Sequence, residues 1–161
     1  MTKLKEQNTS QLFDIQEVRN YRIAIVRTDY HEKYVTSLEE HAVRTLLKNG
    51  VEEKNISSVV VPGAWEIPLA VKKVAESKKF DAVITFGVVL KGDTLHFEMI
   101  ANEVGRALMQ LSLEFGIPVA LEVLAVFDLQ QAEERTKNDS TNKGIEAATA
   151  VLKTLVELKK I

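Results

Sequence analysis

The strongest constraint on the fold is that four apolar runs rich in β-forming residues alternate with segments whose apolar residues recur at the spacing of a helix. The runs cover residues 22–26, 58–61, 82–90 and 119–126. Most are continuously apolar, which is typical of strands buried on both faces of a parallel sheet. Because β-α-β crossovers are short and right-handed, this order predicts a three-layer α/β/α sandwich around a central four-stranded parallel sheet.

Between and after these runs, five segments have the apolar periodicity of amphipathic helices. The first has Ser37 and Glu40 spaced as a capping box at its start, and Gly50 as a stop. His41 lies within this helix among charged residues, and we expect it on the surface. Four more helices are predicted. The second helix follows Pro68, and the third carries an apolar stripe from Ile100 to Phe115. The fourth runs from Asp128 to about Arg135, and the fifth starts at Asn142.

Length and composition limit the class of protein. The 161 residues correspond to a single domain, 1–161, and 45% hydrophobic residues are enough for a core. The net charge of −2 argues against a non-specific nucleic-acid binder or a basic membrane-surface protein. Cysteine is absent, which excludes disulfides, thiol nucleophiles and cysteine-based zinc sites. Without a secretory signal or an apolar run of about 20 residues, we expect a cytoplasmic protein.

Residues 1–20 precede the first strand and are mostly polar. Leu12, Phe13 and Ile15 are the exceptions. We therefore predict an N-terminal arm that becomes ordered against a neighbouring subunit, by adding to that neighbour's sheet.

Unusual residues gather in the loops after the predicted strands. In open parallel sheets ligands bind beyond the carboxyl ends of the strands, which here selects residues 27–31, 62–66, 91–96 and 127–128. Two of the three histidines, one tyrosine and the only tryptophan fall in these loops. Tyr30 and Trp65 can stack on a planar ligand, or can be rim or interface aromatics.

Two further features favour an anion. Residues 91–94, Lys-Gly-Asp-Thr, lie between a strand and a helix start, where free N–H groups suit a phosphate, although an ordinary helix cap is an equal alternative. Arg135 and Lys143 bracket the segment 136–142. A lysine in the first turn of a helix opposes the helix dipole, which suggests an anion nearby, while two solvated charges are the simpler alternative.

His96 is the candidate for proton transfer. It precedes Ile100 by one helical turn, at the mouth of the predicted site, and a histidine titrates near neutral pH. The alternative for His96, and more strongly for His31, is a hydrogen-bonded boundary histidine. No histidine pair has metal-ligand spacing, and no Gly-x-Gly-x-x-Gly follows the first strand. We expect no metal and no resident cofactor.

Four separated motifs resemble one family. Residues 61–68 (VPGAWEIP), 87–97 (GVVLKGDTLHF), 134–135 (ER) and 142–144 (NKG) are similar to the 6,7-dimethyl-8-ribityllumazine synthases, and the resemblance runs from about residue 22 to about residue 155. It implies a flavodoxin-like fold and a transferase of riboflavin biosynthesis. It also implies a homo-oligomer, either a pentamer or a multiple of it, whose substrates are a ribitylaminouracil and a butanone phosphate.

The resemblance also implies roles for individual residues. His96 would transfer protons, Arg135 would bind the phosphate from the adjacent subunit's side of the site, and Lys143 would contact the ring. The substrate-binding positions carried over are Tyr30 and His31 beside the ring, Ala64, Trp65 and Glu66 on the ribityl chain, Val88, Val89 and Leu90 in the ring pocket, Gly92, Asp93 and Thr94 at the phosphate, and Leu121 as the ring cover.

The sequence also departs from the family pattern. His31 stands where asparagine is common, and Lys91 where arginine is usual. Leu121 and Glu122 replace a usual Phe-Gly, which weakens the cover over the ring. These changes leave room for a catalytically weak flavin- or lumazine-binding regulatory module on the same fold. A receiver-like signalling domain is a third alternative, but Asp29 alone is a poor match to the acidic cluster that it needs.

Overall fold

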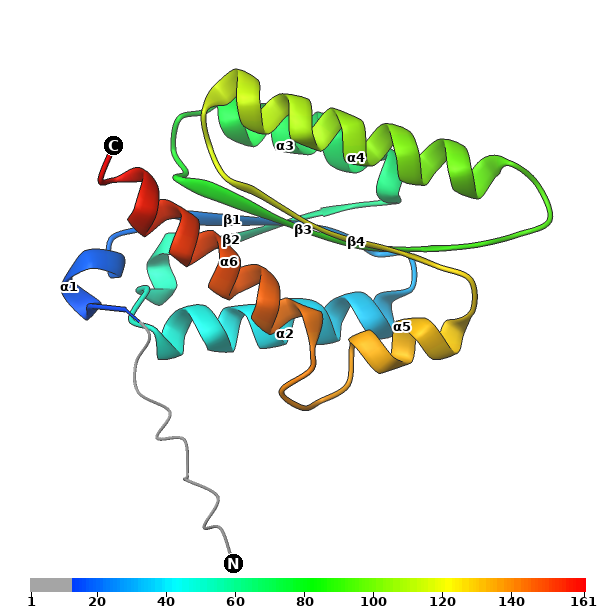
Figure 1. The fold of residues 1–161 in the computed structure, drawn as a ribbon, viewed down its shortest axis with the longest axis horizontal. Helices are drawn as coiled ribbons and strands as arrows, with labels where there is room; N and C mark the ends of the chain where they lie inside the picture. Colours follow the sequence, from blue (N-terminus) through cyan, green and yellow to red (C-terminus); the bar gives the residue numbers. More distant parts are fainter. Residues whose placement is uncertain (1–12) are drawn as a thin grey trace, which may run out of the picture.

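The computed structural model describes residues 13–161, which form a parallel sheet between two helical layers (Figure 1). The strands are β1 (Ile23–Thr28), β2 (Ile56–Val61), β3 (Ala82–Leu90) and β4 (Val119–Val126). They are arranged in the order β2-β1-β3-β4, and every neighbouring pair is parallel. The predicted flavodoxin-like α/β/α sandwich with four parallel strands is confirmed.

Each face of the sheet is covered by its own set of helices, with a separate apolar core beneath it (Figure 1). The core on one face contains Phe86, Ile25 and Leu38, and the core on the other contains Val26, Ile67 and Leu108. The first layer consists of α1 (Ile15–Val18), α2 (Glu32–Lys48), α5 (Leu129–Arg135) and α6 (Lys143–Leu158), and the second of α3 (Ile67–Glu76) and α4 (His96–Phe115); short 3-10 turns lie at Glu53–Asn55 and Ala64–Glu66.

The strands differ in burial according to their place in the sheet. β1 and β3 are central and almost fully buried, as their continuous apolar sequences predict. β2 is an edge strand, and the expectation that it is buried on both faces is wrong, since Val60 is 50% exposed. The helices of one chain cover the central strands and leave the apolar side chains of β2 partly open.

The helix ends show which local signals were reliable. Asp128 and Asn142 cap α5 and α6 as predicted, accepting hydrogen bonds from the N–H groups of Gln131 and Gly144 (both 2.9 Å). The predicted capping box at Ser37 and Glu40 is wrong, because α2 already starts at residue 32. His31, in a left-handed backbone conformation (φ 57°), turns the chain directly from β1 into this helix.

The described part of the N-terminal arm packs on its own chain. Asp14 caps the short helix α1, Val18 is fully buried and Phe13 contacts the same core. Leu12 lies outside the described residues, so pairing of the arm with a neighbouring subunit stays a prediction. Within residues 13–161, none of the helices is long and apolar enough to cross a membrane.

Candidate active site

A cavity of about 770 Å³ opens beyond the carboxyl ends of β1, β2 and β3. Its volume is in the range of small-molecule sites. Its position follows the rule for open parallel sheets, which place ligands at this edge. The lining residues are Tyr30, His31, Gly63, Ala64, Trp65, Glu66, Val88, Val89, Leu90, Lys91, Gly92, His96, Met99 and Ile100.

The loop after β1 forms an aromatic wall. The Thr28 hydroxyl donates a hydrogen bond to the carbonyl oxygen of Tyr30 (3.2 Å), which fixes the start of the turn. The Tyr30 and His31 rings meet edge to face with their centroids 4.4 Å apart. Because Tyr30 is 66% exposed, its ring is available to stack on a flat ligand.

The loop after β2 forms a second wall that is fixed by its own carboxylate. Glu66 accepts a hydrogen bond from the backbone N–H of Gly63 (3.0 Å). A Cβ atom on Gly63 would lie only 3.2 Å from the Glu66 carboxylate, so glycine allows this close approach. Among residues 13–161 the second carboxylate oxygen has no hydrogen-bond donor, which leaves it available for hydroxyl groups, and the neighbouring Trp65, 57% exposed, also lines the cavity.

The end of β3 supplies the floor and a row of main-chain groups. Pairing with β1 ends at Phe86, whereas pairing with β4 continues to Leu90. On the β1 side, the last residues of β3 therefore have no strand partner within the described residues 13–161 for their backbone N–H and C=O groups. Backbone groups out of water need hydrogen-bond partners, and the edge of a heterocyclic ring can provide them.

The start of α4 closes the cavity. His96 is the first residue of this helix, and its backbone N–H donates a long hydrogen bond to the Thr94 hydroxyl (3.4 Å). Gly92 lines the cavity, and a Cβ atom there would meet nothing within 4 Å. Asp93 and Thr94 are exposed beside the cavity but do not line it.

Lys91 is already paired on this rim. Its ammonium group contacts the carboxylate of Glu98 and lies 5.2 Å from the centre of the Phe97 ring. The pairing lowers the pKa of Glu98. The positive charge of Lys91 is thus largely compensated before any ligand arrives.

Three predicted site residues lie away from the cavity in the single chain. Leu121 is on the edge strand β4 and is 51% exposed. Arg135 donates to the carbonyl oxygen of Gln131 (3.0 Å), and Lys143 pairs with the carboxylate of Glu146 (2.5 Å). The chain therefore assembles Tyr30, Trp65 and His96 in one cavity but does not bring Arg135, Lys143 or Leu121 to it.

Glu122 is an ionisable group near Lys143 to which sequence reasoning gave no role. It is half-buried on β4, opposite Phe86 in the sheet register. Burial, with a smaller contribution from nearby Glu146, raises the pKa of Glu122 to about 7, and Lys143 opposes the shift. A single charge inside an otherwise apolar strand was the signal that could have identified it.

His41 corrects another expectation. It was predicted on the surface of the first helix, but it is only 8% exposed, with hydrogen-bond partners at both ring nitrogens. The segment 136–142 folds over this part of α2, and helical periodicity alone does not reveal such a long-range contact.

Comparison with known proteins agrees with this geometry. Residues 20–159 match the family model described as 6,7-dimethyl-8-ribityllumazine synthase. A protein of that name from Gemmatimonas aurantiaca is 42% identical over 134 residues, which cover 83% of this chain and 82% of the relative. The match includes the whole sheet and the helices α2 to α6 that cover its faces, and the chain belongs to the 6,7-dimethyl-8-ribityllumazine synthase family.

Proposed function

We propose that this chain is a transferase that makes 6,7-dimethyl-8-ribityllumazine in the cytoplasm, the penultimate step of riboflavin biosynthesis. It condenses 5-amino-6-(D-ribitylamino)uracil with 3,4-dihydroxy-2-butanone 4-phosphate and releases phosphate and water. The observation that carries the proposal is the cavity itself, which combines exposed aromatic rings, unpaired main-chain groups of β3 and His96 in a member of this family.

The cavity accounts for binding of the pyrimidine substrate. Tyr30 stacks on the ring, with His31 at its edge, while the backbone of residues 88–90 binds the ring through hydrogen bonds. The free oxygen of Glu66 accepts hydrogen bonds from the ribityl hydroxyls beside Ala64 and Trp65. Stacking and hydrogen bonding together hold the reacting amine in one orientation.

The chemistry needs positioning and proton transfer. An amine of the pyrimidine attacks the ketone and loses water to give a Schiff base. Phosphate is then eliminated, which leaves a carbonyl group, and the second amine closes the ring on that carbonyl with loss of a second water. Holding the two substrates together contributes several kcal/mol. His96 moves protons between these intermediates, and the segment 92–94 at the start of α4 receives the phosphate through N–H groups.

Arg135, Lys143 and Leu121 complete the site from a neighbouring subunit. All three lie away from the cavity of their own chain, as a shared site requires. Arg135 binds the departing phosphate, Lys143 contacts the ring and Leu121 covers it. Each site then lies between two adjacent subunits, and the resemblance to the family favours a homopentamer or a multiple of a pentamer as the active form.

The test is direct. The two substrates are mixed with the purified protein, and lumazine formation is followed by absorbance, with His96→Ala as the control. A separate titration with riboflavin measures flavin binding. Product formation that depends on the protein supports the proposal, whereas flavin binding without product would contradict it and favour a regulatory module.

A further inference from the structure

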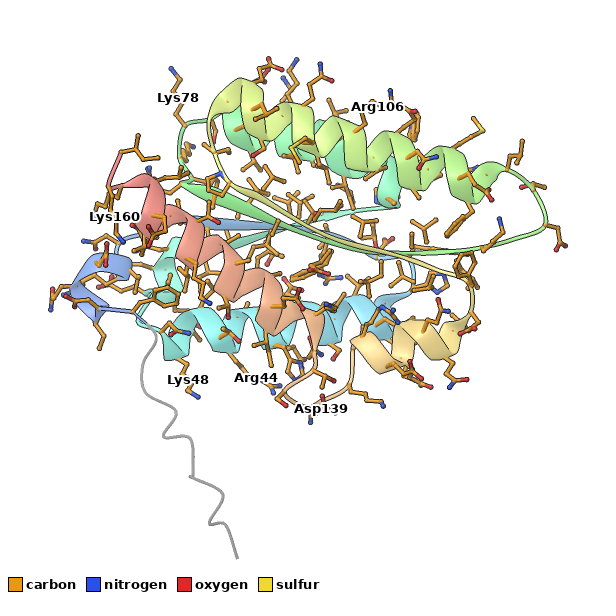
Figure 2. The ribbon with its side chains drawn as sticks, in the orientation of Figure 1. Arg44, Lys48, Lys78, Arg106, Asp139 and Lys160 are labelled. Atoms are coloured by element: carbon orange, nitrogen blue, oxygen red, sulfur yellow. The ribbon has the colours of Figure 1, made fainter. Side chains whose placement is uncertain are left out.

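A partly buried hydrogen-bond network ties the loop between α5 and α6 to α2. The loop consists of residues 136–142, and Figure 2 labels Asp139 within it, on the same side of the sheet as α2. Ser37 and His41 stand one helical turn apart on α2 and bond to different parts of this loop. Neither residue lines the cavity.

Ser37 joins the two ends of the loop. Its hydroxyl donates to the backbone carbonyl oxygen of Thr136 (2.7 Å) and accepts from the side-chain amide of Asn142 (3.2 Å). The same amide donates to the carbonyl oxygen of Lys137 (2.9 Å). Thr136 and Asn142 are both buried, so water competes less for these bonds than for bonds on the surface.

His41 holds the middle of the loop. A carbonyl oxygen only accepts, so Nδ1 donates to the backbone oxygen of Ser37 (2.8 Å). Nε2 lies 2.9 Å from the side-chain oxygen of Asn138. The Asn138 amide can present its oxygen or its NH₂ group to Nε2, so it can match this nitrogen as an acceptor or as a donor.

The two ends of the loop are next to the two cations of the proposed site. Arg135 precedes Thr136, and Lys143 follows Asn142. The start of α6 is also pressed onto α2, because a Cβ atom on Gly144 would overlap the backbone carbonyl oxygen of Leu38. Each cation thus has a backbone neighbour that is fixed to α2.

We propose that Ser37 and His41 are positioning residues, which hold Arg135 and Lys143 at the separation that the phosphate and ring ends of the site require. This inference rests on the proposed function. A long cationic side chain binds a phosphate well only when its backbone is fixed, since misplacement by about 1 Å at a reacting centre costs up to about a hundredfold in rate. The network supplies that fixation from a helix that touches neither substrate.

The first test compares two hydroxyl deletions on α2. Ser37→Ala removes the loop contact, and we expect the KM for the butanone phosphate to rise roughly five- to thirtyfold with kcat changed less. Thr45→Val is the matched control, because the Thr45 hydroxyl bonds within α2, to the carbonyl oxygen of His41 (2.7 Å). The control should leave this KM within about twofold. His41→Leu should shift KM in the same direction as Ser37→Ala.

A second comparison separates positioning from general loss of structure. In an Arg135→Ala background, Ser37→Ala should lower kcat/KM for the butanone phosphate by less than about twofold, because the group that it positions is already gone. An equal loss in both backgrounds, or an equal rise in KM for Ser37→Ala and Thr45→Val, overturns the inference. Light scattering on each variant establishes that the assembly is intact.

Failure of the proposed function gives a different result. If the wild-type protein forms no lumazine, the proposed reaction is wrong, and calorimetric titration with inorganic phosphate then tests the network alone. Weaker phosphate binding by Ser37→Ala than by Thr45→Val supports the positioning role. Equal binding by the two variants, or no phosphate binding by the wild type, overturns it.

Discussion

At the scale of single residues, position in the fold decides which of two similar side chains does chemistry. His96 lines the cavity at the first turn of α4, whereas His41 is buried against a loop on another face of the molecule. Both are histidines on helices, yet only His96 can reach a substrate. Glu66 and Glu122 differ in the same way, since Glu66 lines the cavity and Glu122 lies half-buried near Lys143 of α6.

Replacing His96 tests the proton-transfer role. We expect His96→Ala to reduce kcat roughly ten- to a thousandfold, because acid–base catalysis contributes about 10²–10⁴ in typical enzymes. The KM values should change little, since stacking and main-chain hydrogen bonds remain. Steady-state kinetics of lumazine formation measure both constants, and near-normal turnover would remove His96 from the mechanism.

Glu122 makes stability depend on pH. Its pKa of about 7 in the folded chain is above the ordinary value of 4.5, so the folded state binds the proton more tightly than the unfolded state. Stability is therefore lost as pH rises from about 4.5 to about 7. The difference in unfolding free energy between Glu122→Gln and wild type should therefore increase in favour of the variant by about 1–2 kcal/mol from pH 5 to pH 8, allowing for the partial exposure of the group.

Denaturant unfolding at fixed protein concentration at the two pH values measures this difference. Glu114→Gln is the control, because Glu114 is an exposed carboxylate on α4. A gain for Glu122→Gln that is the same at pH 5 and pH 8 contradicts the predicted titration.

At the scale of secondary-structure elements, the sequence predicted those strands and helix ends that depend on interactions between residues close together in the chain. The four strands, the Asp128 and Asn142 caps and the stop at Gly50 follow from apolar runs and side chains that bond to neighbouring N–H groups. The start of α2 was missed because the left-handed backbone of His31 begins this helix without a side-chain cap. The burial of His41 was missed because a loop about 100 residues further along the chain covers it.

The packing of α6 on α2 depends on one glycine. Gly144→Ala should lower the free energy of unfolding by about 2–4 kcal/mol, because the added methyl group meets backbone that cannot rotate away. Gly92→Ala is the matched control, since its Cβ has no neighbour within 4 Å, and should change stability by less than about 0.5 kcal/mol. Equal stability of the two variants in denaturant unfolding would show that α6 can shift without cost.

At the scale of the whole molecule, one chain presents two partial sites. The cavity lies beyond β1, β2 and β3, while Arg135, Lys143 and Leu121 stand around the outer strand β4. The candidate residues were identified from local motifs, and the family resemblance implied that Arg135 acts from the adjacent subunit's side. The three-dimensional course of the chain adds that Arg135, Lys143 and Leu121 do not line the cavity of their own chain.

A shared site predicts complementation between two variants of low activity. Co-expressed His96→Ala and Arg135→Ala chains should form mixed rings in which about a quarter of the interfaces combine an intact His96 with an intact Arg135. Lumazine synthesis by the mixed rings should then reach up to about a quarter of the wild-type rate, well above either variant alone. Activity that stays at the level of the single variants would place both residues in a site within one chain.

Trp65 has a practical consequence for these experiments. It is the only tryptophan of the chain, and its exposed indole stands at the wall of the cavity. When tryptophan is excited selectively, the intrinsic fluorescence of the folded protein therefore comes from Trp65 alone. Occupancy of the site can be monitored optically in the unlabelled protein, with no dye that would disturb the subunit contacts.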